Sequence, residues 1–173
     1  MKKIVAIVGS ASANSSNLSI VKYLESLYSS DIQFEILEDL KHYPHFVPEL
    51  SVENTPAEIV QFRASIAKAD GIIICTPEYV FSIPSGLKNL LEWSVSTIIF
   101  SDKPVGIITA SANGAKGHEE LQLILRTLGA SLHDNTQLLI QGVKGKITPE
   151  GTITHQETKR LLEEFVKNFL IVN

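Results

Sequence analysis

Apolar positions along the chain follow two alternating patterns. Short runs rich in β-branched residues, which predict strands, are separated by longer stretches in which apolar residues recur at helical spacing. The predicted strands cover residues 3–8, 32–37, 71–75, 104–109 and about 137–140. The predicted helices cover residues 17–30, 56–69, 84–97, 116–128 and 155–170. This alternation is typical of βαβ units and indicates an α/β fold with a parallel sheet.

The polarity of each segment refines this picture. The first and third predicted strands are almost wholly apolar, as central strands covered on both faces are, whereas Gln33 and Glu35 give the second strand an edge-like alternation. Asn17 or a nearby serine can cap the first helix, and Thr55 precedes Pro56 as a cap before a first-turn proline. We therefore expect five helices around the predicted strands.

Length, composition and charge limit the classes of protein. With 173 residues, 44% of them hydrophobic and 20% charged, the chain fits one globular domain, residues 1–173. A net charge of -4 without a long basic run argues against nucleic-acid partners. The apolar start of the chain stops at Gly9, and no segment is long enough to span a membrane. A cytoplasmic location is expected.

Neither the single cysteine nor the five histidines form a catalytic or metal-binding motif. Cys75 follows Ile72–Ile74, which indicates an inert thiol packed in a buried strand, and a lone cysteine fits a reducing compartment. Of the five histidines, only His42 and His45 are closely spaced, and they lack a third ligand. We expect no metal site.

The loop after the first strand is rich in small polar residues. It runs Gly9-Ser10-Ala11-Ser12-Ala13-Asn14-Ser15-Ser16-Asn17 and leads into a helix. Backbone N–H groups, hydroxyls and the helix dipole can converge there on a phosphate. The loop lacks the three glycines of a dinucleotide fingerprint and the Gly-Lys-Ser/Thr of a Walker loop. A plain helix cap remains the alternative.

The loop after the third strand is the most informative stretch. In a parallel sheet with the order 2-1-3-4-5, ligands bind where the loops after strands one and three meet. The segment from Thr76 to Trp93 reads TPEYVFSIPSGLKNLLEW. Together with Gly9-Ser10, Ser15 and Asn17, this segment resembles the NADPH-dependent FMN reductase family, which includes quinone, azo and chromate reductases.

The resemblance implies a flavodoxin-like, three-layer α/β/α fold with a five-stranded parallel sheet in the order 2-1-3-4-5. FMN phosphate would occupy the first loop, and the flavin ring would lie against the loop after the third strand and the turn after the fourth. The implied cofactor-binding residues are Ser10, Ser12, Ser15, Ser16, Asn17, Pro77, Glu78, Tyr79, Val80, Ser82, Ser111, Asn113 and Gly114.

The sequence departs from the family pattern at identifiable positions. Ser12 stands where the family usually has an arginine that binds phosphate, which predicts FMN binding roughly ten to a hundred times weaker unless the serines compensate. Val80 stands where the family often has asparagine, and Asn113 and Lys116 replace glycines.

The implied activity is hydride transfer from NADPH or NADH through FMN to a small acceptor such as a quinone, an azo compound or free flavin. Both substrates would use one flavin face in turn. Because the flavin carries the hydride chemistry, no catalytic side chain is expected. The alternative is a flavodoxin-like electron carrier or flavin sensor without nicotinamide turnover.

The resemblance also implies a homodimer or homotetramer. Leu90 and Trp93 share one face of the third predicted helix, which is either core or, as the resemblance implies, a subunit interface, and we favour an interface for part of that face. The loop 41–54, with Pro44 and Pro48, is either a flap over the acceptor site or a surface connection.

Overall fold

The computed structural model describes residues 2–28 and 32–172, which form a five-stranded parallel sheet in the order β2-β1-β3-β4-β5. The strands are β1 (Lys2–Val8), β2 (Ile32–Leu37), β3 (Gly71–Thr76), β4 (Val105–Ser111) and β5 (Gln137–Gln141). Every neighbouring pair of strands is parallel. The predicted strands, their order and the edge position of the second strand are confirmed.

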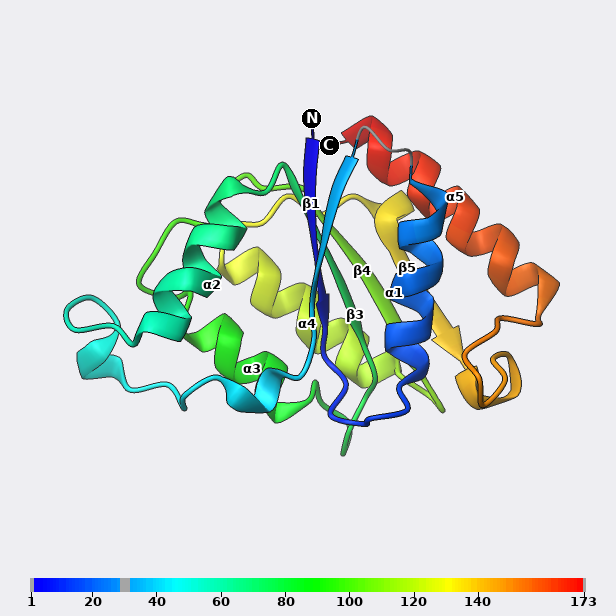
Figure 1. Cartoon of the computed structure of the whole chain (residues 1–173), viewed down its shortest axis with the longest axis horizontal. Helices are drawn as coiled ribbons and strands as arrows, with labels where there is room; N and C mark the ends of the chain where they lie inside the picture. Colours follow the sequence, from blue (N-terminus) through cyan, green and yellow to red (C-terminus); the bar gives the residue numbers. More distant parts are fainter. Residues whose placement is uncertain (1, 29–31, 173) are drawn as a thin grey trace.

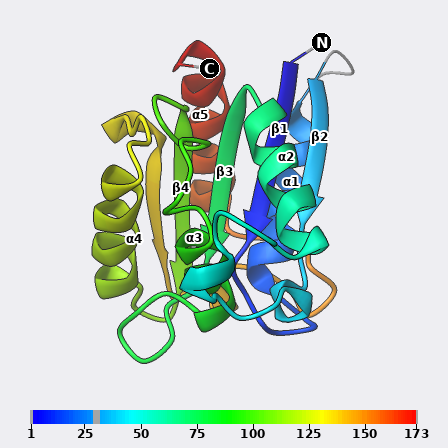
Figure 2. The ribbon, with the colours of Figure 1, turned by 90° about the vertical axis from the view of Figure 1, so that its left-hand side faces the viewer.

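Helices cover both faces of this sheet. They are α1 (Ser16–Leu27), α2 (Ala57–Lys68), α3 (Ser85–Glu92), α4 (Ala115–Thr127) and α5 (Gln156–Val172). Helices α2, α3 and α4 lie on one face, and α1 and α5 lie on the other (Figures 1 and 2). None of the described helices combines the length and the apolar character needed to cross a bilayer.

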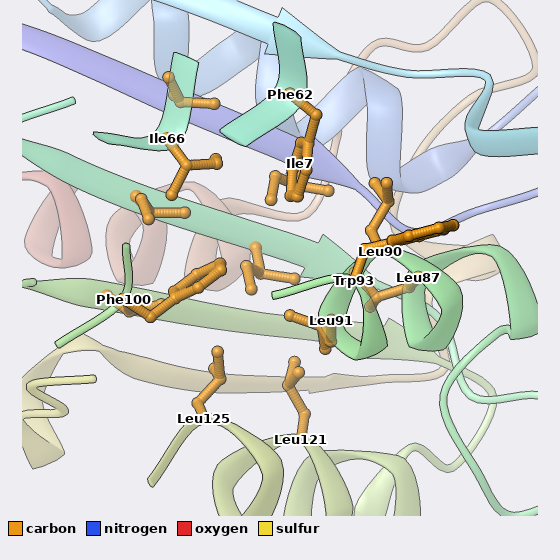
Figure 3. Packing of buried hydrophobic residues seen from close by; sticks show 14 of the residues in the cluster. Ile7, Phe62, Ile66, Leu87, Leu90, Leu91, Trp93, Phe100, Leu121 and Leu125 are labelled. Carbon is orange, nitrogen blue, oxygen red and sulfur yellow. The ribbon is translucent and has the colours of Figure 1, made fainter. Parts of the chain in front are cut away.

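Two hydrophobic clusters hold the three layers together. Because side chains alternate along a strand, Ile7 and Ile74 point to the cluster under α2, α3 and α4, while Ala6 and Cys75 point to the cluster under α1 and α5. Figure 3 shows the first cluster, in which Trp93 lies beside leucines of α3, and Leu121 and Leu125 of α4 lie at the opposite side of the cluster. Leu90 and Trp93 are fully buried within the chain, which confirms the core alternative for these two residues and shows the interface alternative to be wrong for them.

The third helix is shorter than predicted. The periodicity suggests a helix to Thr97, but α3 ends at Glu92 and gives way to turns. The guanidinium of Arg63 donates to the carbonyl oxygen of Trp93, with its Nε at 3.0 Å. That carbonyl would accept the N–H of Thr97 in a continuing helix, whereas Thr97 N–H bonds Ser94 O instead.

The ends of two other helices also differ from the expectation. Helix α2 begins at Ala57 with Pro56 at its N-cap, and Thr55 Oγ1 donates to Leu50 O at 2.8 Å rather than capping the helix. Helix α1 is capped by Ser15, whose Oγ accepts from Leu18 N at 3.3 Å. It ends at Leu27, and residues 29 and 30 of the predicted helix lie outside the described residues.

The segment 41–54 is anchored to α3. The carbonyl oxygen of Pro44 accepts hydrogen bonds from Asn89 Nδ2 at 2.9 Å and from Trp93 Nε1 at 2.8 Å. Phe46 packs edge-on against Trp93 with ring centroids 5.2 Å apart. These contacts with a buried tryptophan fix the segment over one end of the sheet.

Candidate functional site

The carboxyl ends of four strands meet at one edge of the sheet and surround a pocket. The loops after β1, β3, β4 and β5 enclose about 390 Å³, which lies in the usual range for small-molecule sites. In Figure 1 this edge lies at the bottom of the molecule. The residues lining this flavin-sized pocket are Ser10, Ser12, Asn14, Ser15, Ser16, Asn17, Pro77, Tyr79, Ala110, Ser111, Ala112, Gly142, Val143, Lys144 and Gly145.

Gly9 allows the loops after β1 and β3 to approach closely. A Cβ atom at this position would lie 2.4 Å from Thr76 Oγ1, far inside a normal contact. Gly9 N–H donates to Cys75 O at 2.9 Å, which continues the pairing of the two strands into their loops. Glycine after β1 is therefore required by the close approach of the two chain segments.

The loop after β1 brings its polar groups to the N-terminus of α1. Ser10 Oγ lies 3.4 Å from Tyr79 Oη and accepts from Ser12 N at 3.2 Å. Ser15 and Ser16 both line the pocket, and the hydroxyl of Ser15 also caps α1. Free N–H groups of the first helical turn and the positive end of the helix dipole favour an anion at this end of the pocket.

Asn17 is buried and ties three elements together beneath the pocket. Its Nδ2 donates to Ala110 O at 3.2 Å, and its Oδ1 accepts from Cys75 Sγ at 3.3 Å. Both side-chain groups are thus engaged within the protein. Burial raises the pKa of the Cys75 thiol, so the thiol stays protonated, and the predicted inert packing role of Cys75 in a buried strand is confirmed.

Glu78 lies outside the residues that line the pocket and supports α4 instead. Its Oε2 accepts from Gly117 N at 2.9 Å in the first turn of α4, where the N-cap residue is Gly114 and provides no side chain. Ser111 Oγ donates to Glu78 O at 3.4 Å. Glu78 therefore caps a helix from a different element and joins the loops after β3 and β4.

The loop after β3 forms a tight, exposed turn. Tyr79 and Ser82 exchange backbone hydrogen bonds of 2.9 and 3.1 Å, and the two residues between them have φ angles of 53° at Val80 and 60° at Phe81. Their side chains are 94% and 74% exposed. Positive φ is a strained conformation for valine and phenylalanine. Val80 and Ser82 do not line the pocket.

Two further expected residues shape the turn after β4 without lining the pocket. Asn113 Oδ1 accepts from Gln141 Nε2 at 3.1 Å and thereby links the ends of β4 and β5. Gly114 has a φ of 87°. Lys116, which replaces a glycine of the family pattern, forms an exposed ion pair with Glu119 at 2.7 Å.

Sequence reasoning missed the turn after β5. Gly142, Val143, Lys144 and Gly145 all line the pocket. Parallel strands present their carboxyl ends at one edge, and glycines directly after a predicted strand mark a turn there. That rule, applied to the fifth strand as it was to the first and third, would have placed this turn at the site.

Among the described residues, no group of three or more histidine, cysteine, aspartate or glutamate side chains is arranged to hold a metal ion. His42 instead lies 2.7 Å from Asp39.

Comparison with known proteins gives a consistent set of relatives. Residues 2–144 match the profile of a family described as NADPH-dependent FMN reductase. The chain is 31% identical to an NADH:(hydroxy)cinnamate reductase subunit of Vibrio ruber, over 96% of this chain and 85% of the relative. It is also 31% identical to a 2-hydroxy-1,4-benzoquinone reductase of a Burkholderia species, over 96% and 93%.

The fold is shared with solved flavoenzyme structures. The NAD(P)H:(acceptor) oxidoreductase of Paracoccus denitrificans superposes with a TM-score of 0.85 at 24% identity, covering 99% of this chain and 96% of that one. This likeness confirms the flavodoxin-like architecture.

Proposed function

The chain belongs to the NADPH-dependent FMN reductase family, and from this premise we propose that it transfers hydride from NAD(P)H through FMN to a quinone-type acceptor in the pocket at the carboxyl edge of the sheet. The observation that supports this site most directly is the convergence of four loops on one pocket whose lining contains most of the residues expected to bind FMN. The proposed reaction is that of an oxidoreductase with a bound nucleotide cofactor.

The residues present fit FMN. The pocket combines an anion-favouring helix N-terminus with a wall formed by Pro77 and Tyr79, and a proline-led wall suits a planar ring. Eight expected residues line it, namely Ser10, Ser12, Ser15, Ser16, Asn17, Pro77, Tyr79 and Ser111, and we propose these as its FMN contacts. For Glu78, Val80, Ser82, Asn113 and Gly114 we propose supporting roles in the surrounding turns.

The protein groups act by binding and orientation. When bound, the flavin supplies hydride acceptance and donation. The loop from Ser10 to Ser16 would hold the phosphate end of FMN, and Pro77 and Tyr79 would limit the position of the ring. The side-chain hydrogen bonds of the buried Asn17 connect the start of α1 to the ends of β3 and β4. Nicotinamide donor and acceptor would use this one pocket in turn.

The proposed acceptor class rests on the relatives. Two of the proteins compared are named quinone reductases of different organisms, and the chain covers 93% of one and 87% of the other. The test is oxidation of NADPH and NADH by the purified protein with added FMN and a benzoquinone. Rapid turnover supports the reductase. FMN binding without nicotinamide oxidation by any acceptor would support the alternative electron carrier or sensor.

A pocket-filling variant makes this test specific. Ala112 lines the pocket and is exposed, so Ala112→Trp should lower kcat/KM for the quinone and weaken FMN binding, each at least about tenfold, a change that corresponds to about 1.4 kcal/mol. The matched control is Ala64→Trp, on the exposed side of α2, which should leave both values unchanged. Equal activity of the two variants would argue against the pocket as the site.

We also propose that the protein is a cytoplasmic homodimer or homotetramer. Exposed apolar side chains occur in the turn after β3, at Val80 and Phe81, and in the segment after α3, at Val95 and Ile98. Apolar surface of this kind is typical of subunit contacts. Light scattering coupled to gel filtration tests the assembly, and Phe81→Ser should shift it toward monomer if this surface is used.

A further inference from the structure

The loop expected to hold the FMN phosphate has no positive side chain. Residues 9–17 contain neither lysine nor arginine. A phosphate monoester carries about −1.5 to −2 charges at neutral pH, and hydrogen bonds to a charged partner are about twice as strong as neutral ones. A cation close to this loop would therefore change FMN affinity substantially.

Lys144 is the cation that the fold brings to this place. It is the only charged residue among the described residues that line the flavin-sized pocket, and no acidic side chain accompanies it there. Lys144 also lines the adjoining groove beside α1, together with Asn14, Ser15 and Ser16. The two cavities share these residues, so Lys144 lies at the phosphate end of the pocket rather than at the Pro77 end.

The turn that carries Lys144 is fixed to the core. Gly142 N–H donates to Ala112 O at 3.1 Å, and Gly145 N–H donates to Gly142 O at 3.1 Å. Val143, which lies between Gly142 and Lys144, is only 5% exposed and packs in the cluster under α1 and α5. The backbone at Lys144 is thus held at the pocket edge, and an approaching anion need not order it.

The side chain itself is available for binding. Lys144 is exposed and forms no ion pair or side-chain hydrogen bond with the described residues. This distinguishes it from Lys88 and Lys116, which are paired with carboxylates of their own helices. Glu150 lines the neighbouring groove but not the flavin-sized pocket.

We propose that Lys144 binds the 5′-phosphate of FMN and supplies the positive charge that the serine-rich loop lacks. This proposal rests on the proposed FMN-dependent function. Lys144 is a binding and specificity residue, since it recognises the phosphate group and so separates FMN from riboflavin, which has the same ring without that group.

The test compares two ligands and three variants. Dissociation constants for FMN and riboflavin are measured by quenching of flavin fluorescence with wild type, Lys144→Gln and Lys144→Arg. The control is Lys22→Gln, because Lys22 lines the groove but not the flavin-sized pocket. Lys144→Gln should weaken FMN binding about tenfold, which is the smaller end of the range for a charge-assisted hydrogen bond, and leave riboflavin unchanged.

The other variants complete the test. Lys144→Arg should keep near-wild-type FMN affinity, and Lys22→Gln should have no effect on either ligand. Added salt should weaken FMN binding to wild type more than to Lys144→Gln. Equal FMN affinity of wild type and Lys144→Gln, or an equal loss for both ligands, would overturn the role of Lys144. Failure of wild type to bind FMN would instead overturn the proposed function.

Discussion

At the scale of single residues, Asn17 belongs to a sequence motif and also has a structural role that the motif does not reveal. The motif marks Asn17 as a phosphate contact, whereas its side chain bridges Ala110 O and Cys75 Sγ. Both partners come from strands far away in the sequence, so no local pattern could reveal them. The position of Asn17 in the site was predictable, and the bonds of its side chain were not.

Val80 is the residue at which local strain is most evident. It has a φ of 53° and a side chain that is 94% exposed, so it gains little burial in return for an unfavourable backbone conformation. Asparagine adopts positive φ more readily. Val80→Asn should therefore raise the free energy of unfolding by about 1 kcal/mol.

Urea unfolding measures this change. Val52→Asn is the matched control, because Val52 is also exposed and lies outside the positive-φ positions of the described residues. It should leave stability within about 0.5 kcal/mol of wild type. A Val80→Asn protein no more stable than the control would show that the turn is not strained.

At the scale of elements, Glu78 connects the loop after β3 to the start of α4. Its carboxylate accepts the N–H of Gly117 at 2.9 Å, near the positive end of the helix dipole. Glu78→Ala should lower the free energy of unfolding by about 1 to 2 kcal/mol, and Glu78→Gln, which retains an acceptor, should lower it less. Chemical denaturation of the three proteins checks this order, and equal loss in both variants would contradict the capping role.

His118 couples α4 to β4 in a pH-dependent way. Its Nδ1 lies 2.8 Å from the Oγ1 of the buried Thr109, and burial lowers the pKa of the imidazole, partly opposed by Glu119. Because the pKa in the folded state is below the unfolded value of about 6.5, the neutral imidazole contributes stability above that pH. This contribution is lost as the pH falls through the lower, folded-state pKa.

Thermal unfolding between about pH 7.5 and about pH 5 measures this effect. Wild type should lose more stability over this range than His118→Asn, which cannot titrate but offers an amide oxygen to Thr109. Parallel pH profiles for the two proteins would exclude His118 as the source of the change.

Helix ends were less predictable than the helices themselves. Periodicity located all five helices, since each must bury one apolar face against the sheet. The end of α3 depends on Arg63, thirty residues earlier, which occupies the carbonyl of Trp93. The cap expected at Thr55 does not form, because α2 begins at Ala57 and its N-cap residue is Pro56. The bond between Arg63 and Trp93 is a tertiary contact, which leaves no local sequence signal.

At the scale of the whole molecule, the alternation of strands and helices predicted a parallel α/β sheet, and the family resemblance supplied its strand order. All five candidate residues in the loop after β1 line the pocket, whereas in the loop after β3 only Pro77 and Tyr79 do so. The turn after β5 was missed because its signal is short, two glycines flanking Val143 and Lys144. The two core clusters share the sheet as a common layer. This arrangement favours one cooperative folding unit.

The prediction of a single domain follows from that shared sheet. Unfolding should show one transition, with circular dichroism and tryptophan fluorescence coinciding, because Trp93 lies in the core that the strands share. FMN at about 100 times its dissociation constant should raise the free energy of unfolding by about 2.7 kcal/mol. Two separate transitions would contradict the single-domain prediction.

Binding of FMN by this chain and transfer to it of the hydride of a nicotinamide nucleotide are the steps on which the proposed function depends. Anaerobic stopped-flow mixing of the FMN-loaded protein with NADPH or NADH measures the transfer directly. We expect rapid bleaching of the visible flavin band, followed by its return when a quinone is added. A flavin band that stays unchanged in the presence of both nucleotides would contradict the proposed function.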